Sequence, residues 1–227
     1  DAAAEGLDPD DYADSALAAD AGRLREPGIT GLLPDPVRLA ALDLALTRGF
    51  LRYARHAHDG RLPSGALDSA WVAGRDTLDL ARTLRRALDG PLARGEPLDL
   101  APERADYRRL REGLARYRAI AAAGGWRPLP AGPVLKRGAA GAGVLALRRR
   151  LAAEGDSTGR SPEFDAALAR ALRAFQARHG LRESGVVDSA TRAQLDVSAA
   201  ERVRQIAVNL ERERWLPAVL REPHVVV

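Results

Sequence analysis

The 227-residue sequence contains no cysteine, and this absence limits the chemistry open to it. A chain without cysteine has no disulfide, no thiolate metal site and no cysteine nucleophile. Lysine is almost absent too, because Lys136 is the only one and every other basic residue is arginine. No apolar run approaches the roughly 18 residues that a membrane-spanning helix needs.

Several short motifs that identify common enzyme classes are also missing. The sequence has no HExxH, no P-loop and no GxGxxG dinucleotide-binding fingerprint. His56 and His58 are two residues apart, so on a helix they point in different directions and do not favour a shared metal ion. Glu211 and Glu213 form a carboxylate pair on a charged helix, where they are most simply solvated, so we do not expect them to be a catalytic pair. We therefore predict no catalytic residue, no metal site and no cofactor.

Charge is mixed along the chain rather than gathered in blocks. The sequence has 35 basic and 31 acidic residues, which gives a formal net charge of +4. The exception is the run of three arginines from Arg148 to Arg150. Because no basic stripe with interleaved aromatics appears, we predict no nucleic-acid partner. A mildly basic surface would suit an anionic wall polymer.

The first half of the chain shows helical patterns. Asp35 followed by Pro36 is a strong helix start, an N-cap with proline at the first helical position. The pattern predicts a helix that runs to about His58. Its apolar side chains fall on one side, at Leu39, Leu42, Leu46, Phe50 and Tyr53.

Further helices are expected on both sides of this one. A short helix is expected within the first 30 residues, and another helical region contains Trp71 and stops at Gly90. Pro102 is expected to open a helix that Gly124 closes. Such striped helices can only bury their apolar faces against one another, so the pattern predicts an all-α scaffold bundle over residues 1–133. It ends in a stiff linker anchored by Trp126.

The segment 161–195 carries the most specific residue combination. Apolar residues at helical spacing follow Asp165, a candidate N-cap, and Gly180 stands where a C-terminal glycine would end the helix. Asp188 or Ser189 is expected to cap a second helix. The residues that we expect in the core are Leu147, Leu151, Leu168, Leu172, Phe175, Val187 and Leu195.

The order of residues in this segment resembles the small helical peptidoglycan-binding domain of many cell-wall enzymes. The matching residues are Phe164-Asp165, Phe175-Gln176, His179-Gly180-Leu181, Gly185-Val186-Val187, Ala190-Thr191 and Leu195, with Leu135, Gly138, Val144, Leu147, Leu151 and Gly155 upstream. The resemblance implies a compact unit of three short helices over residues 134–196, inserted in the scaffold. As its ligand-binding residues we predict Gln176, Asp188 and Arg192, which are polar where helix end and turn converge.

A second resemblance covers most of residues 40–227. The sequence is similar to the scaffold of large periplasmic L,D-transpeptidases in Tyr107, Leu110, Leu114, Tyr117-Arg118, Ile120-Ala121, Gly124-Gly125-Trp126, Pro128 and Pro130, and again in Ser198, Glu201, Asn209-Leu210-Glu211-Arg212 and Arg214-Trp215-Leu216-Pro217. In that family, residues 197–217 would form a helix that returns to the scaffold. Residues 218–227 would begin the catalytic domain, with Pro223 to Val227 as its first strand.

These resemblances lead to one functional expectation and one alternative. The chain is expected to be the N-terminal, catalytically inert part of a periplasmic L,D-transpeptidase, with peptidoglycan and its own missing catalytic domain as partners. In that family a cysteine thiolate transfers an acyl group between stem peptides. The alternative is a stand-alone adaptor that binds peptidoglycan and recruits another enzyme to the wall.

Overall fold

The computed structural model describes residues 1–23, 35–62, 78–90, 94, 98 and 100–216. These residues form eight α-helices, two short 3-10 helices and no strand, which confirms the predicted all-α class. None of the helices in these ranges is long and apolar enough to span a bilayer. The chain divides into two compact units, one made of Asp1–Leu114 with Ile206–Val227 and the other of Ala115–Gln205.

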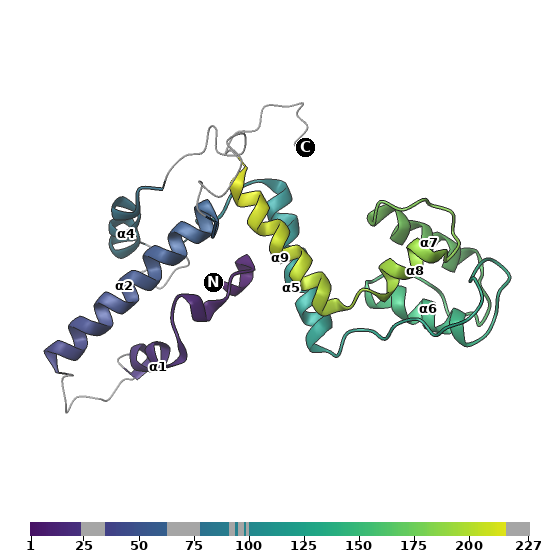
Figure 1. The fold of residues 1–227 in the computed structure, drawn as a ribbon, viewed down its shortest axis with the longest axis horizontal. Coiled ribbons are helices and arrows are strands. Elements are labelled where there is room, and N and C mark those ends of the chain that lie inside the picture. The colour runs from purple at the N-terminus through teal and green to yellow at the C-terminus, as the bar shows by residue number, and fades with distance from the viewer. Residues whose placement is uncertain (24–34, 63–77, 91–93, 95–97, 99, 217–227) are drawn as a thin grey trace. The chain divides into compact units, whose positions relative to one another are not determined.

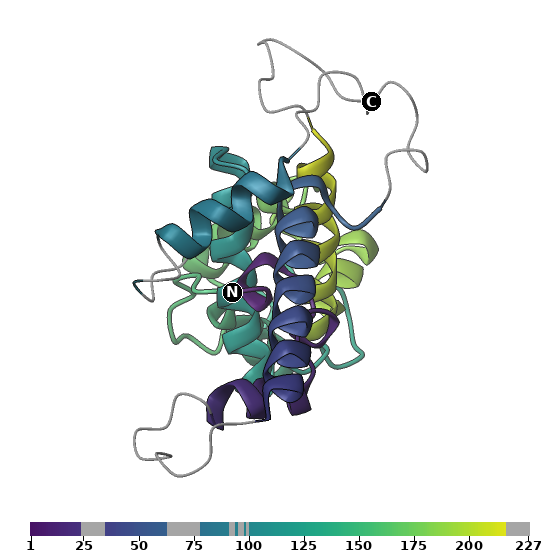
Figure 2. The same cartoon turned by 90° about the vertical axis from the view of Figure 1, so that its left-hand side faces the viewer.

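The longest helix of the first unit is α2, Pro36–Asp59, drawn in blue in Figures 1 and 2. It begins where the sequence predicts, because the Asp35 carboxylate caps it by accepting a hydrogen bond from the Val37 backbone N–H at 3.1 Å. Its apolar stripe is less buried than expected. Within the described residues Leu39 is 37% exposed and Leu46 is 41% exposed, so the bundle buries mainly the C-terminal half of α2.

The other helices of the first unit are α1, Ser15–Arg23, and α4, Leu80–Asp89, with the first part of α5, Ala105–Ala122, and the last part of α9, Ala199–Trp215. The helix expected to open at Pro102 begins at Ala105 instead. Three predicted features lie outside the described residues: the helical segment around Trp71, residue Pro217 and the strand from Pro223 to Val227.

A buried polar cluster fixes the N-terminus of the first unit. The Tyr107 hydroxyl donates a hydrogen bond to the Glu5 carboxylate at 2.6 Å and accepts one from the Arg214 guanidinium at 2.8 Å. Arg111 forms an ion pair with the other Glu5 oxygen at 3.0 Å. Burial raises the pKa of the Tyr107 hydroxyl well above its ordinary value, so the group stays protonated and donates. The cluster ties Glu5 to α5 and α9.

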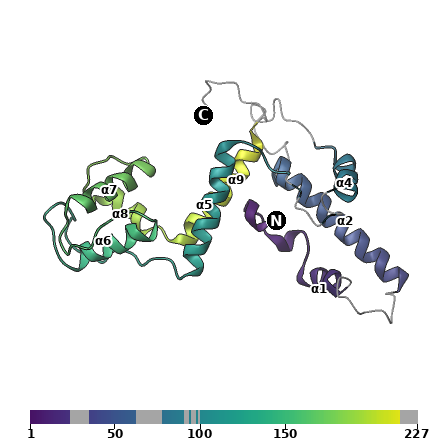
Figure 3. The same cartoon turned by 180° about the vertical axis from the view of Figure 1, so that it is seen from behind.

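The second unit contains three short helices, α6, Ala142–Ala153, α7, Ala166–Arg178, and α8, Ser189–Asp196, grouped together in Figures 1 and 3. All seven residues predicted for its core are buried, with at most 2% of their surface exposed. The ends of the helices also follow the prediction. Asp165 and Asp188 cap α7 and α8, and Gly180 adopts a left-handed φ of 61° directly after α7.

Candidate functional site

Gln176, one of the three predicted ligand-binding residues, is fully buried. Its amide nitrogen donates hydrogen bonds to the Ser184 hydroxyl at 3.2 Å, the Val186 carbonyl at 3.0 Å and the Thr191 hydroxyl at 3.0 Å. Its amide oxygen accepts the Gly185 N–H at 2.9 Å. The amide thus holds the turn between α7 and α8 and has no surface exposed to solvent. Its contact with a ligand stays a prediction.

The other two predicted residues occupy different positions. Asp188 is exposed, and its carboxylate accepts the Thr191 N–H at 2.8 Å, which lowers the pKa of Asp188 below its ordinary value. Arg192 is half-buried and donates hydrogen bonds to the carbonyls of Leu129 and Pro130 in the linker, at 3.5 and 3.2 Å. Gln176 and Asp188 therefore meet at Thr191, whereas Arg192 is engaged with the linker.

A groove on the second unit collects four basic side chains that the sequence reasoning missed. It has a volume of about 280 Å³ and lies between the loop before α6, the N-terminal part of α7 and the turn held by Gln176. We call it the basic groove; its described lining residues are Lys136, Arg137, Ala166, Ala169, Arg170, Arg173, Ser184, Gly185 and Val186. The sequence feature that indicates this groove is the placement of Arg170 and Arg173 away from the apolar stripe of α7.

Most of the charge in the basic groove is unneutralised. No carboxylate is among its described lining residues, and the side chains of Lys136, Arg137, Arg170 and Arg173 form no hydrogen bond or ion pair within the part of the chain that the structure describes. Arg148 differs, since it is buried and forms an ion pair with Asp165 at 3.0 Å. The groove is therefore an exposed cluster of free cations.

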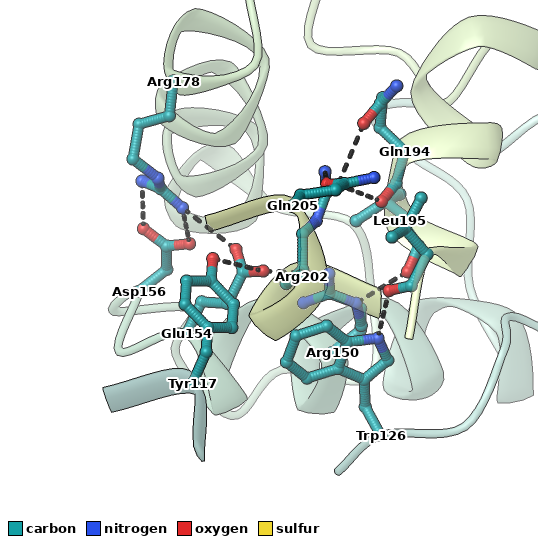
Figure 4. Close-up of polar contacts among 11 residues, drawn as sticks. Tyr117, Trp126, Arg150, Glu154, Asp156, Arg178, Gln194, Leu195, Arg202 and Gln205 are labelled. Atoms are coloured by element: carbon teal, nitrogen blue, oxygen red, sulfur yellow. Dashed lines mark hydrogen bonds and ion pairs between the residues drawn. The ribbon is translucent and has the colours of Figure 1, made fainter. Parts of the chain in front are cut away.

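The core of the second unit also holds a polar cluster around Arg150, shown in Figure 4. The Arg150 guanidinium carbon lies 3.6 Å from the centre of the Trp126 ring, a close cation–π contact. Arg150 also donates hydrogen bonds to the Leu195 carbonyl at 2.7 Å and to the Glu154 carboxylate at 2.9 Å. The first and last members of the arginine run, Arg148 and Arg150, are thus buried and paired, and the run does not form a surface patch.

Glu154 lies at the meeting point of several donors. It accepts a hydrogen bond from the Tyr117 hydroxyl at 3.2 Å, and its other oxygen is 3.5 Å from the Arg178 guanidinium, which is bound more tightly to Asp156. Burial, followed by the charge of Glu154, raises the pKa of Tyr117. These contacts attach the last turns of α5 to the loop after α6.

The start of α9 is fastened to the same cluster. Arg202 donates hydrogen bonds to the backbone carbonyl and side chain of Gln194, both at 2.9 Å, and to Gln205 at 2.9 Å. The Trp126 indole N–H donates to the Val197 carbonyl at 2.9 Å. The linker and the chain leaving α8 are therefore bound to one another, as the sequence indicated for Trp126. Among the described residues, Arg150 Nη1 and Arg202 Nε of this cluster are buried without a hydrogen-bond partner.

The described histidines are each engaged in contacts with neighbouring side chains or a helix end. His56 is hydrogen-bonded to the Tyr12 hydroxyl at 3.0 Å, whereas His58 pairs with Asp59 at 2.6 Å. His179 caps the C-terminal end of α7 and its ring lies 4.2 Å from that of Phe175. Within the described ranges, no three or more His, Asp or Glu side chains are grouped so as to hold a metal ion.

Comparison with known families gives two matches. The scaffold-domain model matches residues 1–114, which is just over half of the 227-residue chain. The peptidoglycan-binding-domain model matches residues 140–195, which include α6, α7 and all but the last residue of α8. No curated protein sequence matches the chain.

Proposed function

The chain belongs to the scaffold-domain family and carries a peptidoglycan-binding domain, and from this premise we propose that it is the non-catalytic part of an L,D-transpeptidase acting in the periplasm. In this role the chain would bind the cell wall and present its stem peptides to a catalytic domain of the same polypeptide. That domain would supply the cysteine thiolate that this chain lacks.

The observation that carries the proposal is the order of the two units along the chain. The first unit is discontinuous in sequence, because it consists of Asp1–Leu114 together with the segment that begins at Ile206. The second unit lies between these two segments in the sequence. The wall-binding domain is thus an insertion in the scaffold, bounded by the continuous helices α5 and α9. The same order supports the resemblance to the L,D-transpeptidase scaffold.

The insertion has a physical consequence for catalysis. A module that binds the wall weakly raises the local concentration of stem peptides near any domain attached to it, to the millimolar range for short connections. Trp126 and Arg202 fasten both connections of the module within the second unit, which limits the freedom of the linker. We therefore expect the module to change the apparent KM for intact wall and leave the chemical step unchanged.

Wall binding is tested by sedimentation with purified sacculi. The full chain should be retained more strongly than a variant from which residues 134–196 are deleted, and more than an unrelated helical protein of net charge +4. Circular dichroism of the deletion variant checks that its helices persist. Retention equal to that of the unrelated protein would contradict the wall-binding role.

The link to a transpeptidase needs a separate experiment. The natural gene product should be assayed for cross-link formation on intact sacculi and on soluble tetrapeptide-bearing muropeptides. Deleting residues 134–196 should reduce cross-linking of sacculi and spare the reaction with soluble muropeptides. A natural product that ends at Val227, or that forms no cross-links, would favour the adaptor. Cross-linking by residues 1–227 alone would contradict the assignment of chemistry to another domain.

A further inference from the structure

The basic groove is shaped to receive a small anionic group rather than a long polymer. Its volume of about 280 Å³ lies just below the range of pockets that enclose drug-sized ligands. That space accommodates one or two amino-acid residues of a peptide. The small side chains of Ala166 and Ala169 of α7 also line it, and neither obstructs a close approach to the helix.

The positive charges converge from two separate segments. Lys136 and Arg137 precede α6, and Arg170 and Arg173 lie one turn apart on α7. Like charges held in one groove repel one another, and a bound anion relieves this repulsion. Guanidinium groups also match carboxylates in geometry, since each offers parallel N–H donors. Carboxylate is therefore the ligand chemistry that these side chains fit.

The wall of the groove is held in place before any ligand arrives. Gly185 has a left-handed φ of 67°, and a Cβ at this position would lie 3.1 Å from the Arg173 guanidinium carbon. The turn and the guanidinium are thus in close contact. The buried amide of Gln176 fixes the same turn by accepting the Gly185 N–H and donating to the Val186 carbonyl. Gln176 is therefore a positioning residue for the groove.

We propose that the basic groove binds the carboxylates of peptidoglycan stem peptides, so that the module recognises the peptide and not the glycan strand. The inference rests on the wall-binding function proposed above and names the part of the wall that is bound. A sugar strand presents mainly hydroxyl and amide groups, which would leave four clustered cations without partners. A stem peptide brings the carboxylates that neutralise them.

The proposal is tested by titrating the full chain with four soluble probes while following the backbone amide signals of residues 134–196 by NMR. The probes are a disaccharide-tetrapeptide, the tetrapeptide with its N-terminus acetylated, the same tetrapeptide with its carboxylates amidated, and the peptide-free disaccharide with its lactyl carboxylate amidated. We expect the first two to bind equally and to shift signals of the groove. Amidation should weaken binding at least tenfold, and the disaccharide should not bind.

Two double variants locate the site. The first double variant combines Lys136→Gln with Arg137→Gln, and the second combines Arg170→Gln with Arg173→Gln. Each should weaken tetrapeptide binding about tenfold, because each removes two exposed charge contacts that contribute several-fold to the affinity apiece. The matched control is Arg127→Gln with Arg149→Gln, which removes the same charge from exposed positions outside the groove and should leave affinity unchanged. Arg173 contacts the turn, so its substitution could unfold the second double variant. The first double variant does not change Arg173 and therefore still tests the site.

Each contrary outcome has a distinct meaning. Sacculus retention without tetrapeptide binding, or equal affinity in the groove variants and the control, would overturn the carboxylate site and leave wall binding standing. Binding of the disaccharide alone would assign recognition to the glycan. Inorganic phosphate that binds as tightly as the tetrapeptide and competes with it would show a general anion site. If the unmodified chain is not retained by sacculi, both the wall-binding function and the carboxylate site are contradicted.

Discussion

The Arg150 guanidinium is stacked on the Trp126 ring at 3.6 Å while it donates a hydrogen bond to the Glu154 carboxylate at 2.9 Å. Both charged side chains of this i, i+4 pair are at most 2% exposed. An ion pair buried to this extent gives little net stability compared with an apolar pair, but leaving one partner without the other is costly. The pair is therefore the point at which the second unit is most sensitive to a single charge change.

Substitution of Arg150 tests this relationship. Arg150→Met should destabilise the second unit by about 3 to 5 kcal/mol, because it leaves Glu154 buried with weaker partners. The measurement is the free energy of unfolding from native-state hydrogen exchange, averaged over amides of α6 to α8.

Two further variants give the controls for this prediction. Adding Glu154→Gln to Arg150→Met should recover most of the loss, because the unpaired charge is then removed. Arg149→Met, at the exposed neighbouring position, should change stability by less than about 0.5 kcal/mol. A loss below about 1 kcal/mol in the Arg150→Met variant would show that the buried pair is not structurally important.

Truncation of Phe175 tests the core of the three-helix module. Phe175 is fully buried and contacts the His179 ring at a centroid distance of 4.2 Å. Phe175→Ala should cost about 3 to 5 kcal/mol, since it removes a large apolar surface and leaves a cavity. Hydrogen exchange of α7 measures the change, and Ala174→Gly at an exposed position of the same helix is a control expected to cost about 1 kcal/mol. Equal losses in the two variants would contradict the assigned core.

Two helical glycines of the first unit should respond in opposite ways to alanine. A Cβ at Gly49 of α2 would collide with the Tyr12 carbonyl oxygen, whereas a Cβ at Gly22 of α1 would meet nothing within 4 Å. Gly22→Ala should stabilise α1 by about 0.5 to 1 kcal/mol, the usual gain in helix propensity. Gly49→Ala should destabilise despite that gain, as measured in urea melts followed by circular dichroism. Stabilisation by both would show that Tyr12 is not packed against α2.

The stability of the second unit should fall in mild acid. Burial of the ring, followed by the charge of Arg202, lowers the pKa of His179 below its ordinary value. The unfolded chain binds this proton at about pH 6.5, before the folded state does, so the folded state loses stability as pH falls below that value. Hydrogen exchange of α7 at about pH 7.5 and about pH 5.5, corrected for the intrinsic exchange rate, measures the loss.

The substitution His179→Gln isolates this effect. The variant should show a smaller loss of stability over the same interval, because the titrating group is gone. The N-cap carboxylates of Asp165 and Asp188 have lowered pKa values and stay ionised throughout it, so they do not contribute. An unchanged pH dependence in the variant would assign the effect to other groups.

The sequence alone determined the secondary structure and core of the second unit. Asp165, Asp188 and Gly180 act within one turn of their own helix ends, and the spacing of Leu168, Leu172 and Phe175 defines a single helical face. Such features depend on residues close together in the chain, so a local pattern is sufficient to predict them. The all-α class followed from the same patterns.

Only the tertiary structure decided which polar residues face solvent. Gln176 belongs to the buried side of α7 because its amide fits the turn that follows, and Arg150 is buried because Trp126, Glu154 and the end of α8 surround it. The basic groove likewise joins Lys136 to Arg173 and Gly185. These neighbours are separated by many residues in the chain, and their approach is set by how the three helices pack, which no local pattern of the sequence contains.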